Sequence, residues 1–238
     1  MALIEARFRG PPGVGNGGYV AGRMAALLGR QPLEVTLRRG WPLDVPLGIR
    51  RRDGLVEACD AAGQVIAEAR PVEFALEVPP PPSVAEAAAA TRWFAEGPFS
   101  HSQGQCFVCG TALAEGVGLR VFTGRVPGRP GVAAALWRPA AGFAGADGTI
   151  DPAYLWSALD CAGHFAFTVD AAPGRMLLGR IAGELRGPVA VGEACIVLGW
   201  QIAAEGRKRH AGTAIFGADG GLRGLARALW VVPAPTPA

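Results

Sequence analysis

The stretch that decides the fold spans residues 151–167, DPAYLWSALDCAGHFAF, and its apolar residues recur at helical spacing. Asp151 suits the N-cap, where its side-chain oxygen accepts a free N–H of the first turn, and Pro152 suits the first helical position. Gly163 and the alanines leave the helix surface thin enough for another backbone to approach. Asp160 lies inside this apolar pattern. An acid in mid-helix is more often a solvent-facing charge or a satisfied buried group, so its meaning depends on the rest of the chain.

Length and composition set broad limits. The chain has 238 residues, which allows one large domain or two of roughly 110 residues each. Hydrophobic residues make up 50% and charged residues 18%, and the net charge of +3 is too mild to indicate nucleic acid as the main partner. Five cysteines, an odd number in a chain of this length, predict reduced thiols rather than a disulfide framework.

The N-terminal residues predict no targeting segment. MALIEAR lacks a charged region followed by an apolar run, so it is not typical of a signal peptide. No uncharged apolar segment reaches the length of about 18 residues that a membrane span needs. We therefore expect a soluble, cytoplasmic protein with no membrane partner. Lys208 is the only lysine beside many arginines, and with the abundant Ala, Gly and Pro this suggests a GC-rich bacterial genome.

The first half predicts one helix followed by strands. A strand is expected at 3–9, a glycine-rich loop at 10–18 and a helix over 19–28. The loop could favour an anion, but it lacks both the Gly-Lys-Ser/Thr and the dinucleotide fingerprints. Strands are then expected at 33–39, 47–52, 55–59 and 64–76, the last two joined by a hairpin turn at 60–63.

The second half predicts the same order of elements. Four prolines at 79–82 predict a stiff spacer, and 84–94 a short linking helix. Strands are expected at 118–123 and 132–137, then the helix 151–167, then strands at 176–186, 193–204, 209–216 and 222–232. A half with one apolar helix and a long antiparallel sheet buries both by wrapping the sheet around the helix. We therefore predict an α+β fold with repeats at 1–78 and 96–233, a linker at 79–95 and a disordered tail at 234–238.

The chain resembles the hotdog-fold acyl-CoA thioesterases, in the tandem double-hotdog form with two copies in one polypeptide. The resemblance covers nearly the whole chain, and its most specific segments are WSALDCAG at 156–163, LLGRI at 177–181 and GPVAVGE at 187–193. It implies two antiparallel sheets that join and wrap around two central helices. In the phenylacetyl-CoA thioesterase-like branch, the pattern is His-Gly-Gly, six residues, then a catalytic acid on the central helix.

The resemblance implies that each half keeps a different part of this pattern. Asp160 takes the acid position of the second half, where Asp151-Pro152-Ala153 replaces His-Gly-Gly. In the first half Asn16-Gly17-Gly18 takes the His-Gly-Gly position and Ala25 the acid position. In this family the acid of one copy works with the glycine end of the other copy's helix. One site is therefore expected, built from Asn16, Gly17 and Gly18 together with Asp160.

Thioester hydrolysis explains why these residue types are needed. A backbone N–H at a helix N-terminus stabilises the negative oxygen that develops on the carbonyl, and Gly17 suits this role because no side chain blocks close approach. Asp160 would act as general base on water or as a nucleophile that gives a mixed anhydride, and both remain open. Asn16 could orient the water or the carbonyl, or simply cap the helix.

The predicted substrate is a small-molecule acyl-CoA thioester whose acyl group is not specified by the sequence. Gly18, Tyr19 and His164 are the substrate-binding candidates. No metal or redox cofactor is expected, because coenzyme A enters only as part of the substrate. A homodimer of such chains is one possible assembly, and the sequence does not specify the oligomeric state.

Two other functions stay open. His164 lies four residues after Asp160 on the same helix face, and an Asp–His pair could support hydration of an enoyl thioester. The Asp/His motif of the hotdog hydratases is not found in this sequence. A non-catalytic acyl-CoA binding protein would keep the pocket and show affinity without hydrolysis.

Cysteines and basic runs offer further candidates. Cys106 and Cys109 have the spacing of half a zinc knuckle, but a closed site needs four ligands and only His101 lies near them. Packed thiols are the preferred interpretation, and Cys161 is expected to pack because it points about 100° away from Asp160 on the helix. The basic runs at 50–52 and 207–209 could attract the phosphates of coenzyme A or simply be solvated.

Overall fold

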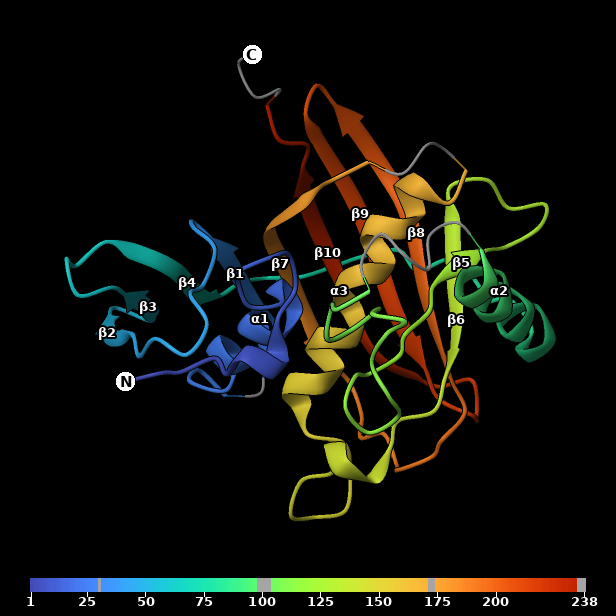
Figure 1. Cartoon of the computed structure of the whole chain (residues 1–238), viewed down its shortest axis with the longest axis horizontal. Helices are drawn as coiled ribbons and strands as arrows, with labels where there is room; N and C mark the ends of the chain where they lie inside the picture. Colours follow the sequence, from blue (N-terminus) through green and yellow to red (C-terminus); the bar gives the residue numbers. More distant parts are fainter. Residues whose placement is uncertain (30, 98–103, 171–173, 235–238) are drawn as a thin grey trace.

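The computed structural model describes residues 1–29, 31–97, 104–170 and 174–234 (Figure 1). Within these ranges ten strands form one antiparallel sheet in the order β2-β3-β4-β1-β7-β10-β9-β8-β6-β5. Their bounds are β1 Leu33–Leu37, β2 Gly48–Arg52, β3 Leu55–Cys59, β4 Val65–Pro71, β5 Gly124–Arg125, β6 Val132–Trp137, β7 Leu177–Leu185, β8 Cys195–Glu205, β9 Lys208–Phe216 and β10 Leu222–Val231. The predicted α+β class and the continuous antiparallel sheet are confirmed.

Three α-helices accompany the sheet in the described part of the chain: α1 Gly17–Ala25, α2 Val84–Glu96 and α3 Pro152–Thr168. Among the described residues, the 3-10 turn Ala6–Phe8 precedes α1 and the 3-10 turn Ala141–Phe143 precedes α3. Helix α3 is buried on nearly all sides, as expected of a helix that is apolar all round. It lies across β8, β9 and β10 and against α1, so the sheet curves around the two helices (Figure 1).

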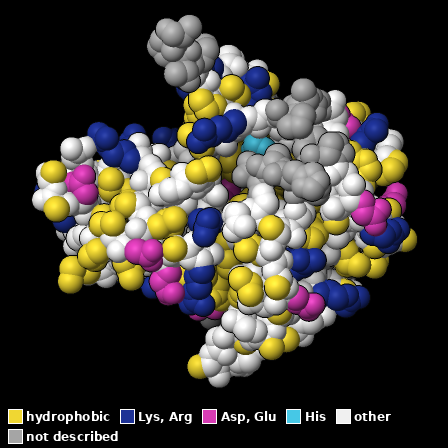
Figure 2. All heavy atoms as spheres, viewed as in Figure 1, with side chains coloured by type: hydrophobic (Ala, Val, Ile, Leu, Met, Phe, Trp, Pro, Cys, Tyr) yellow, Lys and Arg dark blue, Asp and Glu magenta, His cyan; other side chains and the backbone are white. Residues whose placement is uncertain are grey.

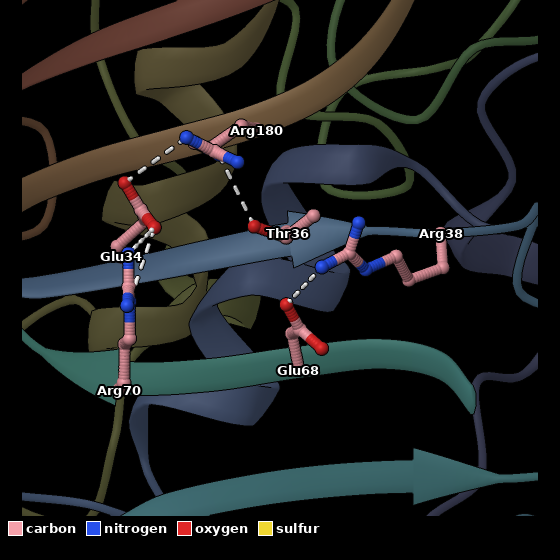
Figure 3. A network of polar contacts seen from close by, with 6 residues as sticks. All are labelled: Glu34, Thr36, Arg38, Glu68, Arg70 and Arg180. Atoms are coloured by element: carbon pink, nitrogen blue, oxygen red, sulfur yellow. Dashed lines mark hydrogen bonds and ion pairs between the residues drawn. The ribbon is translucent and has the colours of Figure 1, made fainter.

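The two halves of the sheet join where β1 pairs with β7. Leu33 lies opposite Gly183 and Thr36 opposite Arg180. On the face away from the core, Glu34 accepts hydrogen bonds from Arg70 at 2.8 and 3.2 Å and forms an ion pair with Arg180 (Figure 3). Exposed ion pairs contribute at most about 1 kcal/mol each, so the backbone ladder and the buried face hold this junction.

The strands on the two sides of the junction have matching orders. Helix α1 precedes four strands arranged β2-β3-β4-β1, and α3 precedes four strands arranged β8-β9-β10-β7. In both cases the first strand after the helix lies at the junction. Strands β6 and β5 extend the sheet only on the α3 side, although an isolated bridge joins Ala2 to Leu47 beside β2.

The segment between the halves covers the outer face of the sheet. Residues 72–83 run extended across it behind β10 (Figure 1), and Arg227 donates a hydrogen bond to the carbonyl of Ala75 at 2.9 Å. Apolar side chains of this segment, Phe74, Leu76 and Val78, pack on a second cluster of buried residues that includes Leu198, Trp200 and Phe216. The predicted helix at 84–94 is confirmed as α2, which begins with a capping box between Ser83 and Glu86. The predicted linker is therefore extended and then helical, and it is packed against the sheet.

Two predicted strands are wrong, because in each segment backbone N–H groups form hydrogen bonds outside the sheet. Residues 3–9 form no strand and contain the 3-10 turn Ala6–Phe8 instead, because Asp44 accepts the Ala6 N–H at 2.9 Å and Phe8 turns into the core. Residues 118–123 form no strand, because Leu119 and Val121 donate to the carbonyls of Phe107 and Val108.

Smaller differences concern the element ends. Helix α1 begins at Gly17 and ends at Ala25, rather than spanning 19–28. The predicted hairpin at 60–63 is confirmed, with Gly63 at a φ of 78°. Of the predicted tail 234–238, residues 235–238 lie outside the described residues.

The surface carries charges of both signs, as the mild net charge of +3 leads one to expect. Basic and acidic side chains are interspersed on the face shown in Figure 2. Among the described helices, none combines the length and apolar character that crossing a membrane requires.

Candidate active site

The N-terminus of α1 meets the middle of α3 at a very close helix crossing. A Cβ atom added at Gly18 would lie 2.5 Å from the Cβ of Asp160 and 2.9 Å from the Cα of Ser157. One added at Gly22 would lie 2.6 Å from the Cα of Ala153. Since real Cβ atoms do not approach so closely, both positions require glycine. The crossing brings the start of α1 to the acid in the middle of α3.

Asp160 is bound by two donors from the first half of the chain. Its Oδ2 atom accepts hydrogen bonds from the Gly18 N–H and from the Asn16 Nδ2, both at 2.9 Å. The Oδ1 of Asn16 accepts from the Tyr19 N–H at 2.9 Å. Asn16 therefore both caps α1 and orients the acid. The structure brings together Asn16, Gly17, Gly18 and Asp160, as the resemblance implies.

The environment of Asp160 favours its protonated form more than water does. Burial raises the pKa of Asp160 to about 7, and the hydrogen bonds from Gly18 and Asn16 only partly offset this effect. The side chain is 2% exposed, and its Oδ1 atom has no hydrogen-bond partner in the described structure. A carboxyl group that titrates near neutral pH is suited to acid–base chemistry.

A cavity of about 420 Å³ opens beside this acid. Four of the predicted residues line this cavity, namely Asn16, Gly17, Asp160 and His164. Residues from both halves form the rest of the wall, among them Arg38, Arg39, Trp41, Arg175, Leu178 and Trp230. Within the described residues the Gly17 N–H has no acceptor.

Tyr19 and His164 occupy different surroundings. Tyr19 stacks on Phe8 with ring centroids 3.9 Å apart, in an aromatic cluster away from the cavity wall. His164 packs edge-on against Phe165 and Trp230. Burial lowers the pKa of His164 to about 4, so its ring is neutral at neutral pH.

The residues of the alternative arrangement around Asp151 lie outside the cavity beside Asp160. Asp151 accepts the Ala153 N–H at 2.8 Å and so caps α3, with Pro152 in the first helical position. Ala25, at the acid position of the first half, is buried in the core. None of these residues lines the cavity beside Asp160.

Sequence reasoning missed a cluster of three cysteines beside this acid. The sulfur atoms of Cys106, Cys109 and Cys161 all lie within 4.8 Å of one another, and all three residues line the cavity. Hydrogen bonds from the Cys109 and Cys161 thiols, followed by the backbone N–H groups of Cys109 and Val108, lower the pKa of Cys106. His101 lies outside the described residues.

The predicted basic runs lie away from the cavity. Arg50 pairs with Glu57 on the outer strand β2, and Arg51 donates to the Leu27 carbonyl. Arg209 donates to carbonyls of the β8–β9 turn. Arg38, Arg39 and Arg175 line the cavity instead, and no spacing in the sequence indicates this because they come from separate loops and strand ends.

Comparison with solved structures identifies the fold. The tesB protein of Mycobacterium avium subsp. paratuberculosis is 15% identical, with 94% of this chain and 89% of that chain covered and a TM-score of 0.60. A candidate thioesterase from Novosphingobium aromaticivorans is 13% identical, with 94% of this chain and 91% of that chain covered and a TM-score of 0.60. A hot dog fold protein from Alicyclobacillus acidocaldarius is 13% identical, with 99% of this chain and 93% of that chain covered and a TM-score of 0.55.

The chain therefore has the hotdog fold, and neighbours that share this fold include proteins named as thioesterases. No protein-family model and no curated protein matches the chain.

Proposed function

We propose that the protein hydrolyses an acyl-CoA thioester at one site formed between two hotdog units of the same chain. The observation that carries this proposal is the meeting of Asp160 with the N-terminus of α1 at the wall of the cavity. The matching strand orders around the β1–β7 junction support two units, since each unit has one helix followed by four strands.

The N-terminus of α1 supplies the electrostatic part of the mechanism. Gly17 lines the cavity and its N–H has no acceptor in the described chain, whereas the neighbouring Gly18 N–H donates to Asp160. A free N–H at a helix N-terminus stabilises a developing oxyanion without reorganisation. Gly17 would therefore hold the thioester carbonyl oxygen.

Asp160 supplies the bond-making part. As general base it takes a proton from water, which then attacks the carbonyl carbon and releases the thiol of coenzyme A. As nucleophile its Oδ1 attacks the carbonyl carbon, the C–S bond breaks and coenzyme A leaves as a thiolate, and water then hydrolyses the mixed anhydride to the free acid and the regenerated carboxylate. Its Oδ2 is held by Asn16 and Gly18, so either route uses an oriented carboxyl group.

Arginines on the cavity wall favour coenzyme A as the carrier of the acyl group. Arg38 and Arg39 follow β1, and Arg175 precedes β7, so both halves place positive charge beside the cavity. Phosphate groups are bound well by guanidinium groups. The buried indole N–H groups of Trp41 and Trp230 have no partner in the described structure, and both tryptophans line the cavity.

A panel of short, long and aryl acyl-CoA thioesters tests the proposal by release of free thiol. Release from at least one of them by the wild type, and not by Asp160→Asn, is the expected result. Tight binding of the panel without release would instead indicate a binding protein. Water addition to crotonyl-CoA would indicate a hydratase and overturn the proposal.

A further inference from the structure

Three buried thiols converge at one point on the cavity wall. The sulfurs of Cys106 and Cys161 are 3.9 Å apart, and the Cys109 sulfur lies within 4.8 Å of both. Zinc bound by thiolates has Zn–S distances of about 2.3 Å, which place tetrahedral sulfurs about 3.8 Å from one another. The cluster is therefore close to the arrangement in which three sulfurs share one metal ion.

The loop 106–110 has the geometry of a metal-binding knuckle. The Gly110 N–H donates to the Cys106 carbonyl at 2.8 Å, and a Cβ at Gly110 would lie 2.4 Å from that carbonyl oxygen. This tight turn directs the N–H groups of Val108 and Cys109 toward the Cys106 sulfur. Amide donors aimed at a sulfur favour the thiolate, which is the form that binds metal.

The loop is held in this shape independently of any ligand. The Phe107 N–H donates to the Arg9 carbonyl, and the Leu119 N–H donates to the Phe107 carbonyl, both at 2.8 Å. The Val121 N–H donates to the Val108 carbonyl at 2.9 Å. Segment 118–123, which forms no strand, thus fixes the position of the loop beside α3.

Polar groups of the candidate active site adjoin the cluster. The Asn16 Nδ2 atom lies 3.9 Å from the Cys106 sulfur and 2.9 Å from the Asp160 Oδ2. Asp160, directly before Cys161 in the chain, has a buried Oδ1 without a partner in the described structure. The Cys106 sulfur thus lies beside polar groups, whereas a thiol that only fills apolar space would be surrounded by apolar side chains.

We propose that Cys106, Cys109 and Cys161 bind one soft divalent metal ion of the chemistry of zinc, with the fourth coordination position on the cavity side. Three protein ligands and one open position are typical of zinc sites that take water or a ligand. This differs from the expectation of packed thiols, because the third sulfur comes from α3. The proposal does not depend on thioester hydrolysis.

Metal content and spectroscopy of the reduced full-length protein test the site. We expect one zinc per chain after purification with zinc present. In metal-stripped protein, added Co²⁺ should give thiolate-to-cobalt charge-transfer absorption and the d–d bands of a tetrahedral site. Cys106→Ser, Cys109→Ser and Cys161→Ser should each abolish stoichiometric binding. Cys59→Ser and Cys195→Ser are matched controls, because both residues are buried free cysteines outside the cluster, and they should bind like the wild type.

X-ray absorption of the wild-type zinc protein gives a readout that needs no variant to fold. Three sulfur ligands at about 2.3 Å support the site. Failure of the reduced wild type to take up metal, a shell with fewer than three sulfurs, or full binding by Cys161→Ser would overturn it.

Discussion

At the residue scale, Asp160 lies where an ionised carboxyl group costs stability. It is buried, one oxygen has no partner in the described structure, and its pKa is raised from an ordinary 3.8 to about 7. Between these values the folded protein holds a proton that the unfolded chain releases. The contribution of Asp160 to the free energy of unfolding therefore falls as the pH rises from about 4 to about 7, by roughly 4 kcal/mol.

This gives a prediction about stability. Asn at position 160 can still accept hydrogen bonds from Gly18 and Asn16 but carries no charge. Asp160→Asn should therefore lack this pH-dependent loss of unfolding free energy. Urea unfolding of metal-stripped protein should show the variant more stable than the wild type at pH 8, with a smaller difference at pH 5. Parallel stability curves from pH 5 to pH 8 would contradict the role given to burial.

Gly17 is tested by comparing two substitutions. Gly17→Pro removes the N–H, and proline is tolerated in the first helical position, so the helix should survive. Its kcat should fall by about 100-fold or more, the usual cost of losing an oxyanion donor. Gly17→Ala keeps the N–H and adds a Cβ whose three nearest atoms belong to the side chains of Leu178 and Leu37 rather than to backbone, so its kcat should fall much less. Equal losses would indicate a steric role instead.

At the scale of elements, the crossing of α1 and α3 depends on Gly18. A Cβ there would meet the backbone of α3 at 2.7–2.9 Å, so the helices must separate. Gly18→Ala should lower the free energy of unfolding by about 1–3 kcal/mol, with Gly17→Ala as the control for adding a methyl group nearby. Thermal unfolding of the two variants checks this, and equal stability would show that the crossing can relax freely.

Elements whose signals are local were predictable from the sequence. Helix α3 has its cap, its proline and its apolar period within one stretch, and the structure confirms it as Pro152–Thr168 with Asp151 as N-cap. The strand predicted at 118–123 was wrong because its N–H groups bond the loop at 107–108, which no local pattern reveals.

The residues of the candidate site also differ in whether the sequence could predict their contacts. The pairing of Asn16 with Asp160 was predictable through the resemblance, since the motif marks both positions. The contact of Cys161 with Cys106 was not, because the direction of one helical side chain toward a distant loop depends on tertiary packing. The cavity arginines were missed for the same reason.

At the scale of the whole molecule, both halves place arginines at the cavity. Arg39→Gln should raise KM for an acyl-CoA by roughly fivefold, about 1 kcal/mol for an exposed charge against a phosphate, while kcat changes little. The same acyl group on pantetheine, which lacks the nucleotide, should show no such change. Arg52→Gln, on the outer strand β2, is the matched control and should leave KM unchanged. An equal effect on both substrates would place the nucleotide elsewhere.

The central claim is that one site combines Asp160 of the second half with the N-terminus of α1 from the first. The most direct measurement is kcat for Asp160→Asn beside Asp151→Asn, because both replace an acid of α3 with the same residue. We predict that Asp160→Asn lowers kcat on the order of 10³-fold, while Asp151→Asn, which still caps the helix, turns over like the wild type. Loss of turnover in Asp151→Asn with activity retained in Asp160→Asn would contradict the account.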